Sequence, residues 1–324
     1  MAETFEQRGV LVVGSANMDL VVRCDSFPKP GQTILGRDFA MFPGGKGANQ
    51  AVAAAKLGAE VYFLGKMGRD AFGDRLRASL QQDGVRLDYL LEDPEVATGT
   101  ALITVDSTGQ NEIIVASGSN MRLTPQDVRA RREVFSRVSV VLLQLEIPLE
   151  TVQESARLAK EARCRVILNP APARALPEEL IRMVDLITPN ETEVAALMRQ
   201  RATDTDSVVA AAAQLSQEKG VEIIVTLGRD GATHFANGHR ASYPARPVTA
   251  VDTTAAGDAF NGALAFALSA EMPVAEAIPL ANAVAALSVT RAGAQPSMPD
   301  AAELAAFAPD VAQGVWTSPS NQHT

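Results

Sequence analysis

The chain has 324 residues, a formal net charge of −9, 47% hydrophobic residues and 21% charged residues. This composition is typical of a globular protein that can bury a large core without disulfides or structural metals. The acidic balance argues against nucleic acid as a partner, because binding a phosphate backbone needs clustered Lys and Arg. No apolar run approaches the ~20 residues of a membrane span, and residues 1–9 lack a signal-peptide pattern. With only Cys24 and Cys164 present, we expect reduced thiols and a cytoplasmic protein.

The N-terminal region begins with a short apolar strand, Val10–Val13, followed directly by polar residues that include Asn17 and Asp19. Polar side chains at the carboxyl end of a buried strand are well placed to meet a ligand. Two further extended stretches are predicted at 20–23 and 33–42, with turn residues between them.

From residue 48 onward, helices and strands alternate. Helices are predicted at 48–57, 71–82, 149–162, 259–268 and 274–286, and strands at 60–64, 138–143, 165–168, 186–188 and 222–226. This alternation implies right-handed βαβ units and a mostly parallel central sheet flanked by helices, which is an α/β fold. Strands at 100–105 and 112–116 fit the alternation poorly. We predict one domain over 1–310 with a small β-sheet lid, built from segments at about 20–42 and 98–116, and a flexible tail over 311–324.

Two motifs go beyond a generic α/β pattern: Gly44-Gly45-Lys46-Gly47-Ala48-Asn49-Gln50-Ala51, and Asp252-Thr253-Thr254-Ala255-Ala256-Gly257-Asp258-Ala259-Phe260-Asn261-Gly262. A third is Asn190-Glu191-Thr192-Glu193. Together they resemble the signatures of the ribokinase-like (PfkB) carbohydrate kinase family. Further matches follow in the same order along the chain, at 14–19, 144–146, 169–173, 226–228 and 290–297. The resemblance implies phosphorylation of D-ribose at O5 by ATP, giving D-ribose 5-phosphate and ADP, with Mg²⁺, K⁺ and a homodimer formed through the lid.

Asp258 is the predicted catalytic base. Small residues, including Ala256 and Gly257, precede it, and an apolar helical run follows it, so it lies at a helix N-terminus. Free N–H groups and the helix dipole favour negative charge there. We predict that Ala256 and Gly257 form an anion hole for the γ-phosphoryl group, while Asp258 accepts the proton of the sugar hydroxyl. The alternative is an acid that only stabilises the first turn of the helix.

A neutral sugar needs converging hydrogen-bond partners rather than an apolar slot. The positions that resemble the sugar-binding residues of the family supply such groups: Asn17, Asp19, Gly45, Lys46, Asn49, Glu146 and Asp258. The acidic groups disfavour a substrate that is already phosphorylated. A missing sugar hydroxyl would leave a site group unpaired at about 1–3 kcal/mol, so deoxy sugars can be discriminated. Kinases of 2-deoxyribose, fructose or adenosine stay open as alternatives, as does a non-catalytic sugar sensor.

The resemblance also assigns nucleotide and metal positions. The nucleotide positions are Asn190, Thr226, Gly228, Gly231, Gly257 and Asn282, although a solvated helix asparagine is an alternative for the last of these. Glu193 is assigned to Mg²⁺, through water because this ion usually keeps several waters. Asn190 and Glu193 also have the spacing of a helix cap. The K⁺ positions are Asp252, Thr254, Ser288, Arg291, Gly293 and Ser297, several of them through backbone carbonyls. The three histidines, His234, His239 and His323, show no metal-ligand spacing with cysteine.

Overall fold

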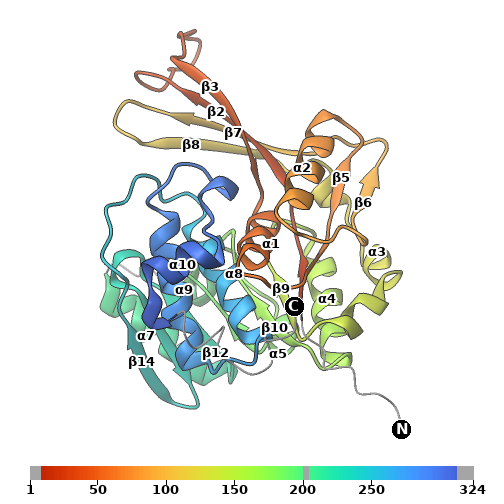
Figure 1. Cartoon of the computed structure of the whole chain (residues 1–324), viewed down its shortest axis with the longest axis vertical. Coiled ribbons are helices and arrows are strands. Elements are labelled where there is room, and N and C mark those ends of the chain that lie inside the picture. Colours follow the sequence, from red (N-terminus) through yellow and green to blue (C-terminus); the bar gives the residue numbers. More distant parts are fainter. Residues whose placement is uncertain (1–8, 200–203, 312–324) are drawn as a thin grey trace.

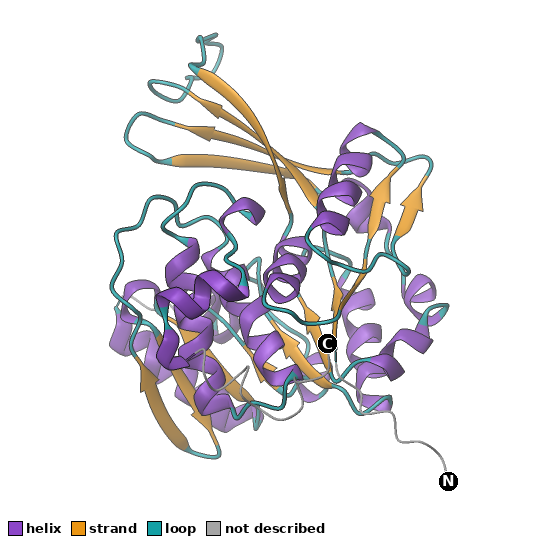
Figure 2. Cartoon of the chain, in the orientation of Figure 1, coloured by secondary structure: helices purple, strands orange, loops and turns teal. Residues whose placement is uncertain are grey.

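The computed structural model describes residues 9–199 and 204–311. Within these residues, eight strands form one sheet, and helices cover both of its faces (Figures 1 and 2). In spatial order the strands are β14 (His239–Tyr243), β13 (Ala232–Ala236), β12 (Glu222–Thr226), β11 (Leu186–Ile187), β10 (Arg165–Leu168), β9 (Val140–Leu143), β1 (Val10–Val13) and β4 (Val61–Leu64). All neighbours are parallel except β12–β13 and β13–β14. The predicted mostly parallel α/β sheet is confirmed.

The antiparallel edge was not predicted. Strands β13 and β14 are joined by Asn237 and Gly238, both with positive φ, of 53° and 76°. An Asn-Gly pair with positive φ at both residues is typical of a two-residue hairpin turn. The dipeptide between two short β-prone runs was therefore a signal for this hairpin.

The central strands are apolar throughout because both faces of the sheet are covered. In β1, Val10 and Val12 pack into one core cluster, and Leu11 and Val13 pack into the other. Alternate residues of a strand point to opposite faces, so an uninterrupted apolar strand fills two cores at once. The first cluster contains residues of α1 (Lys46–Lys56), α2 (Ala71–Gln82), α8 (Ala256–Ser269), α9 (Val274–Ser288) and α10 (Ala301–Phe307). The second contains residues of α3 (Pro125–Arg129), α4 (Leu149–Glu161), α5 (Glu178–Arg182), α6 (Glu191–Met198) and α7 (Thr205–Lys219).

Helices α1 and α8 approach each other closely. A Cβ placed on Gly262 would lie only 2.5 Å from both Ala53 Cβ and Gln50 O, so glycine is needed at this crossing. Each helix begins earlier than predicted, at Lys46 and Ala256, because the preceding Gly45 and Ala255 turn the chain with φ of 88° and 60°. The close crossing brings residues from both helices together near these two N-termini.

The strands of the small separate sheet project from the body in Figure 1. In spatial order they are β3 (Asp38–Gly44), β2 (Asn17–Arg23), β7 (Gly99–Val105) and β8 (Asn111–Ala116). The prediction of a small separate sheet is confirmed, but two boundaries were wrong. Strand β2 begins at Asn17 because it already pairs there with Gly44 and Gly99, while residues 33–37 precede the paired part of β3. A two-stranded parallel sheet, β5 (Lys66–Gly68) with β6 (Leu91–Asp93), was not predicted.

The part of the chain that the structure describes contains no helix long and apolar enough to cross a membrane. Val311, the first residue of the predicted tail, is partly buried against the core. The rest of that predicted tail, 312–324 with His323, lies outside the described residues, as do residues 1–8 of the segment examined for a signal peptide.

Candidate active site

Asp258 lies in the first turn of α8. The residue before the helix, Ala255, has a left-handed backbone with φ of 60°, which starts the helix abruptly at Ala256. The first N–H groups of a helix have no partner within it. A Cβ added to Gly257 would meet nothing within 4 Å, so the space beside this residue is open. The Ala256 N–H donates to Thr253 O at 3.3 Å, and the space beside Gly257 is open, so the start of the helix faces open space at Gly257.

The Asp258 carboxylate is held from two sides by residues of α1. Asn49 Nδ2 donates to Asp258 Oδ2 at 2.9 Å, and Gln50 Nε2 donates to Oδ1 at 2.9 Å. The carboxylate is buried, with the residue only 6% exposed. Burial raises the pKa of Asp258, and the Lys46 charge and both hydrogen bonds oppose that rise. A carboxylate fixed in this way, with a raised pKa, is suited to accept a proton.

Lys46, the first residue of α1, supplies positive charge among buried carboxylates. Burial lowers its pKa, but the charges of Asp258, Glu146 and Glu193 outweigh burial, so the pKa of Lys46 is raised. The ammonium group therefore stays charged. It lies within electrostatic reach of groups that the sequence assigned both to the sugar and to Mg²⁺.

The predicted sugar-binding carboxylates lie close together. Glu146 Oε2 accepts hydrogen bonds from Ser15 Oγ at 2.5 Å and from the Lys46 backbone N–H at 3.1 Å. Burial first, then the charges of Glu146 and Asp258, raises the pKa of Asp19 to about 7. Asp19 packs against Gly44, where a Cβ would lie 2.3 Å from its Oδ2. Asp19, Glu146, Lys46 and Asp258 thus form one charged cluster.

Gly45 allows the start of α1 to approach strand β2. A Cβ on Gly45 would lie 2.6 Å from Asn17 N and 2.7 Å from Ala16 Cα. Neither backbone atom can move without shifting the strand. The second glycine of the first motif is therefore required by close backbone approach as well as by its φ of 88°. Asn17, 3% exposed, lies directly beside it.

Asn190 and Glu193 form the helix cap that their spacing indicated. Asn190 Oδ1 accepts from Glu193 N at 2.9 Å, while Glu193 Oε2 accepts from Asn190 N at 3.0 Å and Oε1 from Asn190 Nδ2 at 3.1 Å. Asn190 also forms a parallel bridge with Thr226, the last residue of β12. Two predicted nucleotide positions thus meet where β11 and β12 end, at the edge where α/β proteins bind ligands.

Two more predicted nucleotide positions, Gly231 and Asn282, lie at the end of β14, whereas Gly228 lies in the turn after β12 and Gly257 in the first turn of α8. A Cβ on Gly231 would lie 2.1 Å from Tyr243 O, so only glycine fits there. Gly228 has a positive φ of 53°. Asn282 Nδ2 donates to Tyr243 O at 3.1 Å and to Pro244 O at 3.4 Å. Because Asn282 is only 6% exposed, the alternative of a solvated helix asparagine is wrong.

The predicted K⁺ positions are brought together only in part. Asp252 Oδ1 accepts from Thr254 N and Oδ2 accepts from Gly293 N, both at 2.9 Å, which joins two loops. The Arg291 guanidinium instead pairs with Glu303 at 2.7 Å. The hydroxyls of Ser288 and Ser297 donate to carbonyls three residues earlier, so their side chains are engaged locally. Within the described residues, no group of three or more His, Cys, Asp or Glu is arranged to hold a metal ion.

Sequence reasoning missed a chain of buried amides and hydroxyls behind Asp258. Gln50 Nε2 also donates to Asn169 Oδ1 at 3.1 Å, and Gln144 Nε2 donates to Gln50 Oε1 at 2.6 Å. From Asn169 the chain continues through Thr188 and Asn261 to the carbonyl of Gly257. All these side chains are buried. The available signal was polar residues inside otherwise apolar, Ala-rich segments, which must find partners once buried.

Residues 7–301 match the pfkB family of carbohydrate kinases. The ribokinase of Haemophilus influenzae is 40% identical over 302 residues, which cover 93% of this chain and 98% of that protein. The deoxyribokinase of Salmonella typhi is 38% identical over 292 residues, covering 90% and 95%. The solved structure of Arabidopsis thaliana ribokinase complexed with ribose and ATP has 35% identity and a TM-score of 0.85, covering 93% of this chain and 98% of that one. With its signature residues gathered around Asp258, the chain belongs to the pfkB family of carbohydrate kinases.

Proposed function

We propose that this chain transfers the γ-phosphoryl group of ATP to the 5-hydroxyl of D-ribose, giving D-ribose 5-phosphate and ADP. The observation that carries the proposal is the buried Asp258 carboxylate next to the open helix N-terminus at Gly257. Full-length similarity to ribokinases, including one solved with ribose and ATP, supports ribose as the sugar.

In the proposed reaction, Asp258 accepts the proton of the sugar hydroxyl as the hydroxyl oxygen bonds to the γ-phosphorus. The bond between the γ-phosphorus and the oxygen it shares with the β-phosphate breaks, and ADP leaves with that oxygen. The N–H groups of Gly257 and Ala256 stabilise the charge on the transferring group, and the Ala256 N–H, which donates to Thr253 O at 3.3 Å, turns to the phosphoryl oxygen when ATP is bound. Gln50 and Asn49 keep the carboxylate oriented, since each donates to one of its oxygens.

Glu193 fits a contact with Mg²⁺ through water. Both of its carboxylate oxygens already accept hydrogen bonds from Asn190, so a water held by the ion suits it better than direct ligation. Burial raises the pKa of Glu193, so a nearby cation would favour its charged form. When bound, Mg²⁺ would neutralise charge on the phosphates of ATP.

K⁺ is proposed to lie between the loops that Asp252 joins, held by oxygen donors of the chain. The Asp252 carboxylate already accepts two backbone hydrogen bonds. The main ligands of the ion would therefore be carbonyl oxygens of these loops. Residues 255–257 come shortly after Asp252 and Thr254 in sequence. The ion would therefore fix the backbone conformation of the anion hole rather than contact the substrate. Assays with Na⁺ in place of K⁺ should show reduced kcat, and identical activity would contradict this site.

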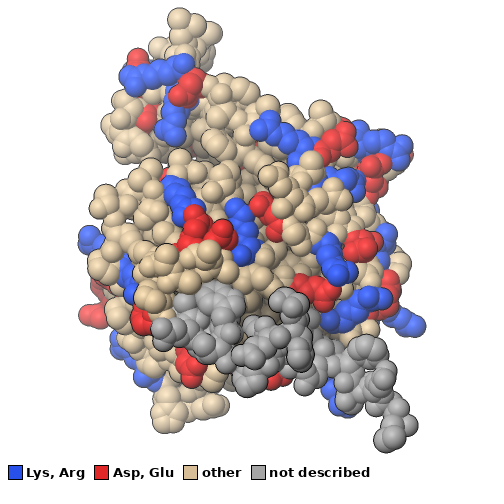
Figure 3. Space-filling model, viewed as in Figure 1, with Lys and Arg blue, Asp and Glu red and all other residues tan. Residues whose placement is uncertain are grey.

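The small sheet is proposed to act as the lid of a single α/β domain and as a dimer contact. Its exposed apolar side chains include Phe39, Leu102, Ile113, Ile114 and Val115, with Ile114 69% exposed. In Figure 3, basic and acidic side chains lie side by side both on the projecting sheet at the top of the view and on the body below it. An apolar sheet surface is typical of an interaction site, and pairing two copies would cover it. Sedimentation should give a dimer that Ile114→Lys weakens, and a wild-type monomer would contradict it.

The proposed function is tested by measuring ADP release with ribose, 2-deoxyribose, fructose, adenosine and fructose 6-phosphate. We expect the highest kcat/KM with ribose and the lowest with fructose 6-phosphate, because the Asp19 and Glu146 carboxylates repel a phosphate. Preference for 2-deoxyribose would place the chain with the deoxyribokinases. Ligand binding without turnover on any of these sugars would favour a sensor.

We expect ribose binding to strengthen as pH rises through about 7, the pKa of Asp19. An ionised carboxylate accepts stronger hydrogen bonds from sugar hydroxyls than a protonated one, so affinity is lost below this pKa. KM for ribose measured from pH 6 to 8.5 should therefore fall with rising pH. Asp19→Asn should raise KM and flatten that dependence, because an amide does not titrate and accepts weaker hydrogen bonds than a carboxylate. An unchanged slope in Asp19→Asn would show that the pH dependence does not come from Asp19.

A further inference from the structure

Asn120 lies where the small sheet ends and the body begins. It belongs to the short 3-10 helix η1 (Gly118–Arg122), which follows β8, and it is 1% exposed. Its side chain reaches back to the connection between β1 and β2. Asn120 Oδ1 accepts from Ala16 N at 3.0 Å, and Asn120 Nδ2 donates to Ala16 O at 3.1 Å and to Asn17 Oδ1 at 2.7 Å.

The Ala16 backbone determines which way the Asn120 amide points. A backbone N–H can only donate, so the Asn120 atom facing it must be the oxygen. The NH₂ group of Asn120 then faces Ala16 O and Asn17 Oδ1. This commits the oxygen of Asn17 to Asn120 and leaves the Asn17 NH₂ group for a ligand. The orientation of the Asn17 amide thus follows, in two steps, from the fixed polarity of a backbone group.

Gly99 makes room for the contact between the two asparagines. It pairs with Asn17 between β2 and β7. A Cβ on Gly99 would lie 2.2 Å from Asn17 Oδ1 and 2.3 Å from Asn120 Nδ2. Any side chain here would separate the two amides, so this arrangement depends on glycine at the base of β7.

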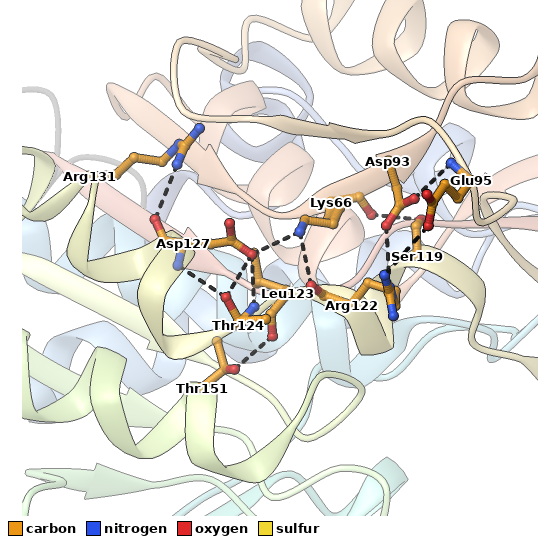
Figure 4. A network of polar contacts seen from close by, with 10 residues as sticks. All are labelled: Lys66, Asp93, Glu95, Ser119, Arg122, Leu123, Thr124, Asp127, Arg131 and Thr151. Atoms are coloured by element: carbon orange, nitrogen blue, oxygen red, sulfur yellow. Dashed lines mark hydrogen bonds and ion pairs between the residues drawn. The ribbon is translucent and has the colours of Figure 1, made fainter.

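The turn that carries Asn120 is bonded to the body on both sides (Figure 4). Lys66 Nζ donates to Arg122 O at 2.9 Å and to Asp127 Oδ2 at 2.8 Å. Ser119 Oγ donates to Lys66 O at 3.0 Å, and Thr151 Oγ1 donates to Leu123 O at 2.7 Å. Asn120 therefore belongs to a firmly held turn, from which it can fix the Asn17 side chain.

We propose that Asn120 is a positioning residue of the sugar site, which orients the Asn17 amide so that it donates to a sugar oxygen. The inference rests on the proposed function and adds a residue that does not itself touch the sugar. It implies that the site selects a sugar with an oxygen acceptor opposite Asn17. Without Asn120, the Asn17 amide can turn and present its oxygen to another oxygen.

The test is a double-mutant cycle on KM for ribose with Asn120→Leu, Asn17→Ala and the double variant. Leu matches the shape of Asn without its hydrogen bonds. We expect Asn120→Leu to raise KM for ribose about tenfold. This corresponds to the loss of one hydrogen bond, of about 1–1.5 kcal/mol, between the Asn17 amide and the sugar. In the Asn17→Ala background the same change should raise KM less than twofold. KM for ATP should stay unchanged in each variant.

Ser119→Ala is the matched control, because it removes a partly buried hydrogen bond from the same turn without touching Asn17. It should leave KM for ribose unchanged. If Asn120→Leu lowers Tm severely, Asn120→Asp replaces it in the double-mutant cycle, because the Asp side chain keeps an oxygen that accepts from Ala16 N. An equal rise in KM in both backgrounds would overturn the proposal, as would the same rise in Ser119→Ala. If the wild-type protein does not phosphorylate ribose, the proposed function fails separately, and the cycle is run on the sugar that the substrate panel identifies.

Discussion

Asp258→Asn is expected to lower kcat by a factor on the order of 10²–10⁴ while the protein keeps its fold and its affinity for ATP. The amide cannot accept the proton of the sugar hydroxyl, although it fills the same space. Its NH₂ group would face one of the two donors that now hold the carboxylate, Asn49 or Gln50. Asn49 Oδ1 has no hydrogen-bond partner in the structure, so the Asn49 amide can turn to accept from the new NH₂ group.

The control separates a base from an acid that only stabilises its helix. Asp74 lies in the first turn of α2, as Asp258 does in α8. Asp74→Asn should change Tm by no more than a few degrees and leave kcat as it was, because it removes only a favourable interaction with a helix dipole. Single-turnover rates and Tm are measured for both variants. Near wild-type turnover in Asp258→Asn, with a fall in Tm like that of Asp74→Asn, would contradict its role as base. Asp258 would then only stabilise the first turn of its helix.

The fold could be predicted where one local pattern decides the structure. Strand β12, for example, was predicted with its observed bounds of 222–226, because this short run is mostly β-branched and too short for a helix. The start of β2 was placed too late, since Asn17 and Asp19 are polar and residues 17–19 pair in a sheet that sequence alone does not align. Pairing between residues about 80 positions apart, such as Asn17 with Gly99, leaves no local signal.

The candidate site shows the same limit. Asp258 and Lys46 could be proposed as site residues from the sequence, because each belongs to a motif whose glycines and small residues have a local physical reason. Gln50 was missed although it lies in the first motif, since its role depends on Asp258, 208 residues away. Asn120 could not be found at all, because its partners lie 103 and 104 residues away on a different strand connection. The residues proposed to touch substrate lie in sequence motifs, whereas the residues proposed to orient them are identified only by their contacts in the structure.

Lys46→Met is expected to lower kcat at neutral pH by about a hundredfold, comparable to the loss of a buried charge partner. Lys46 brings a positive charge to Asp258, Glu146 and Glu193. It is also the strongest influence that lowers the pKa of Asp258 against burial. Without it, the pKa of Asp258 rises further, and the base stays protonated at pH values where the wild-type enzyme works.

The sign of this effect makes it testable. A base must be ionised to act, so kcat rises as pH increases through the pKa of Asp258. Lys46→Met should move this rising part of the pH–kcat profile to higher pH. Part of the lost activity should therefore return as the assay pH is raised. Lys56→Met, at the last residue of α1, is the control, because Lys56 contacts Met298 O and Asp83 and should leave the profile unchanged. If Lys46→Met instead raised KM for ATP with the same pH limb, Lys46 would bind nucleotide phosphate and would not control the ionisation of the base.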